Sequence, residues 1–246
     1  MSNVKEIKMK KLGVIGGLGP MATAYFYQLV VRMTDASKDQ EHINTVIISD
    51  PSTPDRTRFI LGMSNEDPMP FLMESGRELV KQGVDVIAVP CITAHFFQHT
   101  LQDGLGVEVI NAIEETGRYL QKKGIDTIGV IATDGTIETG LFQKTLLNYG
   151  IKCFVPDKNG QETVMHLIYD EIKAGKTAEI DLFNRVADQL FEKGAQIILL
   201  GCTEISLIKK ENKLGKGFLD VMEVLAQKAV LTCGRLREEY KELITE

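Results

Sequence analysis

Two cysteines have the position and the neighbours expected of groups that move protons. Cys91 follows the apolar run Val84–Val89, and Cys202 follows the apolar run Gln196–Leu200. We expect each cysteine to lie at or near the N-terminus of a helix, where backbone N–H groups and the helix dipole favour the thiolate. A free thiol titrates near about pH 8.5, so a modest lowering of its pKa brings it close to cellular pH. The pattern predicts acid/base chemistry at both thiols.

The two cysteines also occupy matching places in an internal repeat. Residues 78–93 read ELVKQGVDVIAVPCIT, and residues 189–203 read QLFEKGAQIILLGCT. Each segment combines the end of a helix, a glycine, a buried strand, and a cysteine followed by a threonine. A single cysteine is as often a buried core residue as a functional one, but two at matching positions favour function. Cys153, inside a predicted strand, and Cys233, in the last helix, lack this setting and are expected to be inert core residues.

Strand-length and helix-length segments alternate almost throughout the chain. The predicted strands are rich in Val and Ile and apolar on both faces, as buried parallel strands are; they are Lys11–Ile15, Thr45–Ser49, Val84–Val89, Val107–Ile110, Thr127–Ala132, Ile151–Phe154 and Gln196–Leu200. The predicted helices are Ala22–Met33, Pro70–Gln82, Ile113–Lys123, Glu138–Tyr149, Gln161–Ala174 and Ile180–Lys193. Gly83, Gly124 and Gly194 fit helix C-terminal caps. This alternation predicts an α/β fold.

The repeat predicts two similar parallel-sheet domains. The first is expected to span residues 1–112 and to regain residues 221–246 at its C-terminal helix, and the second to span 113–220. The chain would then cross twice between the domains, which would let a cleft open and close. Ligands of open α/β sheets bind at the carboxyl ends of the strands, so the two cysteines are expected to meet there.

Composition excludes several classes of protein. The chain of 246 residues has a formal net charge of −6, whereas a nucleic-acid-binding protein usually has a basic face. No apolar run is long enough to span a bilayer, and Met1–Lys11 lacks the cleavage site of a signal peptide. Four cysteines are too few for a disulfide scaffold, which favours a reducing cytoplasm. We expect a cytoplasmic protein that acts on a small molecule.

Six segments, in order along nearly the whole chain, resemble the aspartate/glutamate racemase family, and its aspartate racemases above all. They are Gly16–Pro20, Pro54–Thr57, Pro90–His95, Ala132–Thr136, Ile168–Gly175 and Gly201–Glu204. The resemblance implies two similar αβα domains related by a pseudo-twofold axis, with the active site in the cleft between them. It also implies racemisation of an amino acid without pyridoxal phosphate or metal, commonly in a homodimer.

The resemblance gives the two cysteines their roles. Inversion requires that the α-proton leave one face of the carbon and that a proton return on the other, so one thiolate and one opposing thiol are needed. By resemblance, Cys91 and Cys202 are that pair. Charge that develops on the carboxylate needs fixed donors. The family pattern assigns that role to a set of threonines, namely Thr93, Thr133, Thr136 and Thr203.

The resemblance also suggests which residues bind the substrate. Arg56 and Lys173 match the basic residues of the family, and the planar fork of Arg56 suits a side-chain carboxylate. Tyr169, Asp55 and Glu204 carry over more weakly. The family's first cysteine turn is usually Cys-Asn-Thr, whereas here Ile92 stands in the middle and cannot donate a hydrogen bond. Losing one such donor can lower a rate by roughly 10²–10³, so Ile92 puts aspartate as the substrate in doubt.

Two motifs compete with the racemase interpretation. Residues 17–22 fit the G-x-G-x-x-A dinucleotide pattern, but no acidic residue stands at the end of a second strand about 20 residues on. We therefore expect Gly17 and Leu18 to line the cleft. Cys91, His95 and His99 are spaced four apart and would share a helix face, which leaves a zinc site as a less favoured alternative. There is no Cys-x-x-Cys motif for a thiol-redox protein.

Two other functions remain open from the sequence. Relatives of this superfamily use the same cysteine positions to isomerise or decarboxylate small dicarboxylic acids. A non-catalytic amino-acid-binding protein is the third possibility, which Ile92 alone encourages.

Overall fold

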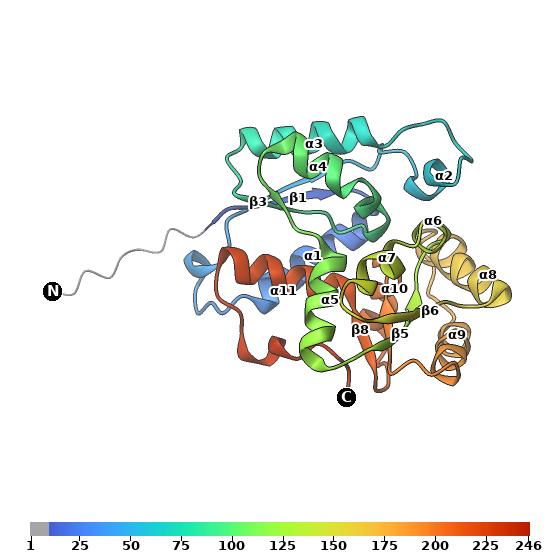
Figure 1. Ribbon diagram of the computed structural model, residues 1–246. Coiled ribbons are helices and arrows are strands. Elements are labelled where there is room, and N and C mark those ends of the chain that lie inside the picture. Colours follow the sequence, from blue (N-terminus) through green and yellow to red (C-terminus); the bar gives the residue numbers. More distant parts are fainter. Residues whose placement is uncertain (1–9) are drawn as a thin grey trace.

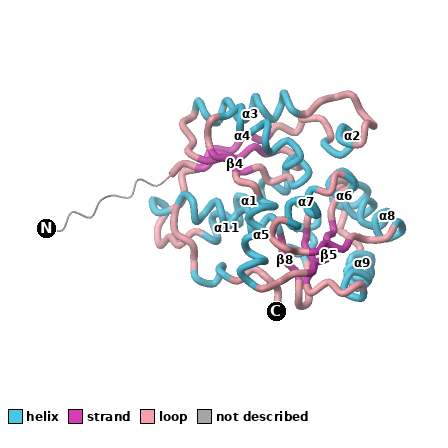
Figure 2. Tube along the Cα trace, viewed as in Figure 1, coloured by secondary structure: helices cyan, strands magenta, loops and turns pink. Residues whose placement is uncertain are grey.

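The computed structural model describes residues 10–246 and contains two parallel sheets, each covered by helices (Figure 1). The prediction that Met1–Lys11 is not a signal peptide falls mostly on residues 1–9, which lie outside the described residues. In Figure 2 the strands form two separate groups, with helices between and around them. Within the described residues, no helix is long and apolar enough to cross a membrane.

The first sheet has the strand order β2-β1-β3-β4, and every pair in it is parallel. Its strands are β1 (Leu12–Gly16), β2 (Thr45–Ser49), β3 (Val86–Ala88) and β4 (Glu108–Val109). Helices α3 (Met69–Lys81) and α4 (Gln98–Leu105) cover one face (Figure 1). Helices α1 (Pro20–Met33) and α11 (Val221–Cys233) cover the other.

The second sheet repeats this order as β6-β5-β7-β8. Its strands are β5 (Thr127–Ile131), β6 (Lys152–Phe154), β7 (Ile197–Leu200) and β8 (Phe218–Asp220). Helices α8 (Lys158–His166) and α9 (Ile180–Glu192) cover the outer face, and α5 (Ala112–Lys123) and α7 (Leu141–Leu147) pack on the other. Shorter helices complete the list, namely α2 (Arg56–Ile60), α6 (Asp134–Glu138), α10 (Thr203–Glu211) and the 3₁₀ turns Asp39–Glu41, Ile92–Phe97 and Glu238–Lys241.

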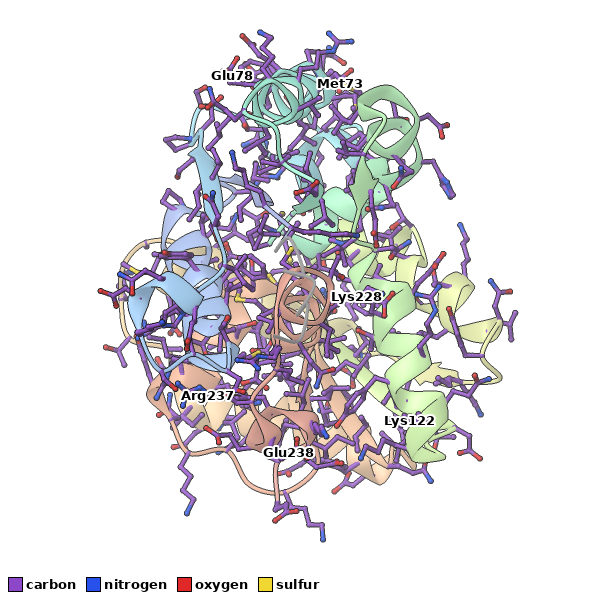
Figure 3. The ribbon with its side chains drawn as sticks, turned by 90° about the vertical axis from the view of Figure 1, so that its left-hand side faces the viewer. Met73, Glu78, Lys122, Lys228, Arg237 and Glu238 are labelled. Atoms are coloured by element: carbon purple, nitrogen blue, oxygen red, sulfur yellow. The ribbon has the colours of Figure 1, made fainter. Side chains whose placement is uncertain are left out.

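Alternate residues of the strands divide between two kinds of core. In β5, Ile128 and Val130 join a core that also receives Leu12 and Val14 of β1, whereas Ile131 faces the separate core under α8 and α9. One continuous apolar core therefore runs between the two sheets through α1, α5 and α11. Lys228 of α11, labelled in Figure 3, lies at the edge of this core. It pairs with Glu115 of α5 at 3.1 Å. The core joins the two halves on the side away from their outer helices.

The predicted fold class is confirmed: two similar parallel sheets flanked by helices form an α/β fold. Each of the seven predicted strands corresponds to an observed strand, but β8 was not predicted. Gly83, Gly124 and Gly194 have φ values of 71°, 69° and 98°, as capping glycines require. The predicted domain limits, 1–112 with 221–246 and 113–220, stay a prediction.

Two predicted helices differ from the observed ones, the first in its continuity and the second in its start and its winding. The helix expected over Glu138–Tyr149 is interrupted between α6 and α7, where Gly140 adopts a φ of 65°. The helix expected over Gln161–Ala174 begins earlier, at the Asp157 cap, and widens into a π-helical turn over Leu167–Ile172. This turn carries Tyr169 and immediately precedes Lys173, both of which were expected at the site.

Candidate active site

The ends of four central strands converge on one small cavity. In each sheet the chain leaves the two central strands toward opposite sides, and such a switch point is where open α/β sheets bind ligands. Leu18 follows β1 and Cys91 follows β3 in the first sheet. Thr133 follows β5 and Cys202 follows β7 in the second. The two sheets therefore present equivalent ends to a shared site.

The cavity is almost closed, with a volume of about 10 Å³, which is the space for about one water molecule and far below the roughly 300–1,000 Å³ of sites for drug-sized ligands. Its lining comes from both halves of the chain and consists of Leu18, Asp55, Arg56, Thr57, Cys91, Ile92, Thr93, Thr133, Tyr169, Lys173, Cys202, Thr203 and Glu204. Cys91 and Cys202 are only 6% and 5% exposed. The site is thus nearly closed in this arrangement.

The cavity includes every predicted site residue except Gly17 and Thr136. Gly17 lies in an adjoining outer hollow, and its φ of 90° and the Asp50 backbone 2.4 Å from where a Cβ would stand explain why it is glycine. Thr136 lies behind the lining and bonds to Thr93 and Thr133. Thr57, not singled out from the sequence, also lines the cavity; its place in the matching segment Pro54–Thr57 was the available signal.

The Cys91 turn is held by a buried histidine. Cys91 has extended backbone (φ −151°) and precedes the 3₁₀ turn Ile92–Phe97. The Ala112 N–H donates to His95 Nε2 at 3.1 Å, so Nδ1 carries the proton and donates to the Cys91 carbonyl at 3.2 Å. Burial lowers the pKa of His95 to about 4, so its ring is neutral. His95 therefore fixes the Cys91 turn against the start of α5.

This arrangement removes the zinc alternative. Both ring nitrogens of His95 have protein partners, and His99 is exposed instead of facing the cavity. Between residues 10 and 246 no group of three or more His, Cys, Asp or Glu side chains could hold a metal ion. The four-residue spacing of Cys91, His95 and His99 does not become a shared ligand face, because the chain there starts as a 3₁₀ turn.

Arg56 presents a fixed positive charge beside Cys91. Its guanidinium is buried and donates to the carbonyls of Leu18, Thr53 and Pro54 at 3.0, 3.1 and 2.9 Å. Burial opposes the charge, but nearby Cys91 raises the pKa of Arg56 above its ordinary value. Within the described residues, Nε of Arg56 is buried without a hydrogen-bond partner. A donor of this kind is available to an anionic ligand.

Cys202 has a different environment from the one expected. It caps the N-terminus of α10, and its thiol donates to Glu204 Oε2 at 3.0 Å. Burial and the Glu204 carboxylate raise the pKa of Cys202 well above its ordinary value, and the opposing effects of Lys173 and of the Glu204 backbone N–H are smaller. The expectation that the helix N-terminus favours a thiolate at Cys202 was therefore wrong. Burial and a neighbouring carboxylate outweigh the helix dipole.

Threonine hydroxyls join the two halves across the cavity. Thr93 Oγ1 lies 2.9 Å from Thr133 Oγ1 and 3.2 Å from Thr136 Oγ1, and the last two are 3.1 Å apart. Thr203 Oγ1 instead donates to Glu204 Oε2 at 3.3 Å. In this closed arrangement the predicted donors thus bond to protein atoms, and they would have to turn to reach a ligand.

A charged network forms the other wall of the cavity. Tyr169 donates its hydroxyl to Asp55 Oδ2 at 3.0 Å, and burial raises the pKa of Tyr169 above its usual range. Lys173 Nζ lies 3.9 Å from both Asp55 Oδ2 and Glu204 Oε1, and 4.5 Å from the centre of the Tyr169 ring. The network joins the first half, through Asp55, to the second.

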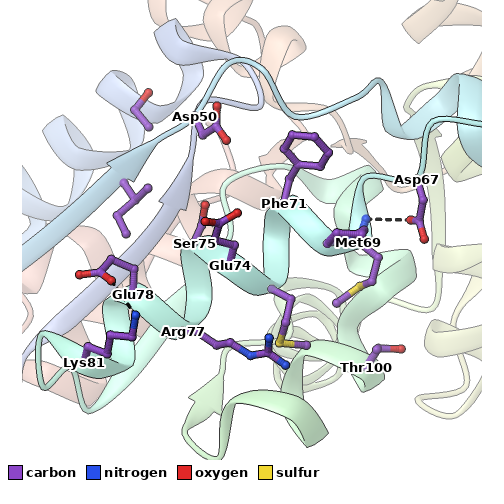
Figure 4. A pocket seen from close by; sticks show the side chains of 14 residues that line it. Asp50, Asp67, Met69, Phe71, Glu74, Ser75, Arg77, Glu78, Lys81 and Thr100 are labelled. Carbon is purple, nitrogen blue, oxygen red and sulfur yellow. Dashed lines mark hydrogen bonds and ion pairs between the residues drawn. The ribbon is translucent and has the colours of Figure 1, made fainter.

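A larger hollow lies elsewhere, between α3 and the edge strand β2 (Figure 4). Its labelled side chains carry both signs of charge, and they include Asp50, Glu74, Arg77 and Lys81. It contains no cysteine and is open to solvent along α3. Size alone therefore does not single out a site, and what distinguishes the smaller cavity is its pair of thiols.

Comparison with known proteins shows that the chain is similar to racemases. The sequence model of the Asp/Glu/Hydantoin racemase family matches residues 15–229. An aspartate racemase of Picrophilus torridus is 30% identical, with a TM-score of 0.83 over 94% of this chain and 98% of that one. A putative Asp/Glu racemase of Yersinia pestis is 26% identical, with a TM-score of 0.75 over 90% and 97%. The broad specificity amino-acid racemase RacX of Bacillus subtilis is 25% identical over 90% and 97%.

Proposed function

The chain belongs to the Asp/Glu/Hydantoin racemase family, and from this premise we propose that it inverts aspartate or a related amino acid with Cys91 and Cys202. Family membership makes it an amino-acid racemase. Two further parts are proposed, namely the identity of the substrate and the use of the cysteines as the two acid/base groups. The relatives named above include an aspartate racemase and a broad specificity racemase, so aspartate and amino acids related to it are the substrates to test first.

The observation that supports the mechanism is the meeting of two thiols from equivalent strand ends in one small cavity. One cysteine, as thiolate, removes the α-proton and becomes a thiol. The other, as thiol, gives its proton to the opposite face of the α-carbon and becomes a thiolate. The net change is inversion, with one proton taken up and one released, so neither an oxidant nor a prosthetic group is required.

Substrate binding is assigned to the groups around the thiols. The free Nε donor of Arg56 and the ammonium of Lys173 suit carboxylates, and both line the cavity. Thr93, Thr133 and Thr203 would supply donors to the carboxylate as it gains charge, and Thr136 would position Thr93 and Thr133 from behind. Gly17 and Leu18 form the turn beside them. These roles are proposals that the geometry supports.

Ile92 makes part of the cavity apolar. It is only 2% exposed and belongs both to the cavity lining and to the core shared by the two sheets. It therefore cannot donate to a carboxylate at a point where the family usually has an asparagine. We propose that the substrate is an amino acid related to aspartate that makes fewer polar contacts with the wall formed by Ile92.

The setting of the enzyme is also a proposal. We infer a cytoplasmic homodimer that acts on a free amino acid and binds no nucleic acid. The net charge of −6 supports the absence of nucleic-acid binding, and the four cysteines, all free in the structure, support a cytoplasmic location; the dimer rests on the resemblance to the family. The domain limits 1–112 with 221–246 and 113–220 belong here too, supported by the two equivalent sheets. Light scattering of the purified chain tests the dimer.

The substrate is identified by a screen. Purified chain, treated with a chelator and free of pyridoxal phosphate, is incubated with single L- or D-amino acids, and the enantiomers are separated by chiral chromatography. Appearance of the opposite enantiomer from aspartate or a related amino acid supports the proposal. Release of CO₂ from a dicarboxylic acid, or turnover only of substrates without an amino group, would contradict it in favour of the isomerase and decarboxylase relatives.

A further inference from the structure

The two thiols of the cavity have neighbours of opposite charge. Cys91 lies beside the buried guanidinium of Arg56, whereas Cys202 donates to the buried carboxylate of Glu204 at 3.0 Å. Glu204 is 6% exposed, so water does little to screen its charge. Two-base inversion needs one thiolate and one thiol, and these neighbours decide where the single proton of the pair resides when no substrate is bound.

We propose that Glu204 is a positioning residue that keeps the proton on Cys202 when no substrate is bound. In this resting enzyme Cys202 is the thiol, ready to act as the acid. This inference rests on the proposed two-base function and assigns a role to Glu204 that differs from binding substrate. The carboxylate accepts from the thiol through Oε2 and faces Lys173 through Oε1 at 3.9 Å. Its hydrogen-bonding capacity is thus directed at protein groups.

The geometry explains why the proton stays. If Cys202 lost its proton, a thiolate would stand at hydrogen-bond distance from the Glu204 carboxylate, and the Lys173 ammonium, 3.9 Å from Glu204 Oε1, would offset the repulsion only in part. Thr203 also donates to Oε2 at 3.3 Å, which holds the carboxylate in place. A like charge this close disfavours the ionised form by roughly one to three pH units, or about 10- to 1,000-fold.

The resting state would make the two enantiomers unequal in a particular way. The enantiomer that gives its α-proton to Cys91 binds the major form of the enzyme, in which Cys91 is the thiolate and Cys202 is the thiol. Its mirror image reacts only with the minor form, in which Cys202 is the thiolate, so its KM is raised by the scarcity of that form. Because enantiomers have equal free energies, kcat/KM must be the same for both, and the higher KM is matched by a higher kcat.

The test compares Glu204→Gln with Glu211→Gln, which removes the same charge from the exposed end of the same helix. The pH dependence of iodoacetamide alkylation is followed at Cys202 by peptide mass spectrometry. We expect the midpoint for Cys202 to fall by at least about one pH unit in Glu204→Gln and to stay unchanged in Glu211→Gln. Comparing midpoints instead of rates removes the common effect of cleft opening. An unchanged midpoint in a folded Glu204→Gln overturns the proposal.

Kinetics of the parent give a second test that does not depend on the variant. With L- and D-aspartate, or the pair that the screen identifies, KM and kcat should each differ about tenfold or more between enantiomers while kcat/KM agrees. In Glu204→Gln both ratios should move toward unity. Equal KM values in the parent overturn the proposal. A shifted alkylation midpoint in a protein that inverts no amino acid would support the role of Glu204 and refute the racemase function, so the two failures are distinguishable.

Discussion

Buried His95 should make the stability of the protein depend on pH in a defined window. Its pKa is lowered from 6.5 to about 4 by burial, so the folded protein holds the ring neutral where the unfolded chain would protonate it. The neutral ring of His95 therefore makes its full contribution to the free energy of unfolding above pH 6.5, and this contribution is lost as the pH falls toward 4. A shift of this size corresponds to about 3 kcal/mol, at 1.36 kcal/mol for each pH unit.

The perturbation is His95→Gln, which keeps an amide able to donate and accept but does not titrate. His99→Gln is the matched control, because His99 is exposed a turn further along the chain. Urea unfolding is measured for the parent and both variants from pH 8 to pH 4. We expect the free-energy difference between parent and His95→Gln to shrink by about 3 kcal/mol toward pH 4. His99→Gln should stay parallel to the parent. A difference between parent and His95→Gln that is flat across this window would refute the assignment.

Three other perturbations test separate parts of the structure. Burial raises the pKa of Asp220 to about 7, so the parent loses stability as the pH rises from 4 to 8, because a buried carboxyl must ionise. The free energy of unfolding of Asp220→Asn should therefore rise relative to that of the parent over this range, and urea unfolding with no such trend contradicts this. Ile92→Asn should raise aspartate turnover if Ile92 directs the site to another amino acid, and unchanged or lower turnover counts against that role. Asp55→Asn weakens the contacts to Tyr169 and Lys173 and should lower kcat/KM roughly tenfold with little change in Tm; full activity argues against a role for the network.

Much of the fold could be predicted because its signals are local. Strand β2 was predicted with its observed limits, Thr45–Ser49, and three capping glycines were predicted from their places between helix and strand. Strand β8 was missed because only Phe218–Asp220 is extended, directly after a polar stretch rich in lysine and glycine. The break at Gly140 was missed because the helical periodicity continues on both sides of it.

The sequence predicted most of the residues that line the cavity, but it predicted their charges and protonation less well. The repeat placed Cys91 and Cys202 at equivalent strand ends, and both line the same cavity. The state of Cys202 could not be read from the sequence, because Glu204 two residues later does not share a helix face with it by regular spacing. Cys202 is the residue before the helix, however, and the Glu204 side chain turns back to accept its thiol. That contact depends on side-chain direction.

The central claim is that two thiols, one from each sheet, carry out the inversion. The most direct measurement is incorporation of deuterium at the α-carbon in deuterated water by the parent, Cys91→Ser and Cys202→Ser. Cys153→Ser is the control, since Cys153 lies in β6 outside the cavity. We predict that the parent and Cys153→Ser form the opposite enantiomer with deuterium at its α-carbon, and that each cavity variant forms none while remaining folded. Full inversion by either Cys91→Ser or Cys202→Ser would contradict the two-thiol mechanism.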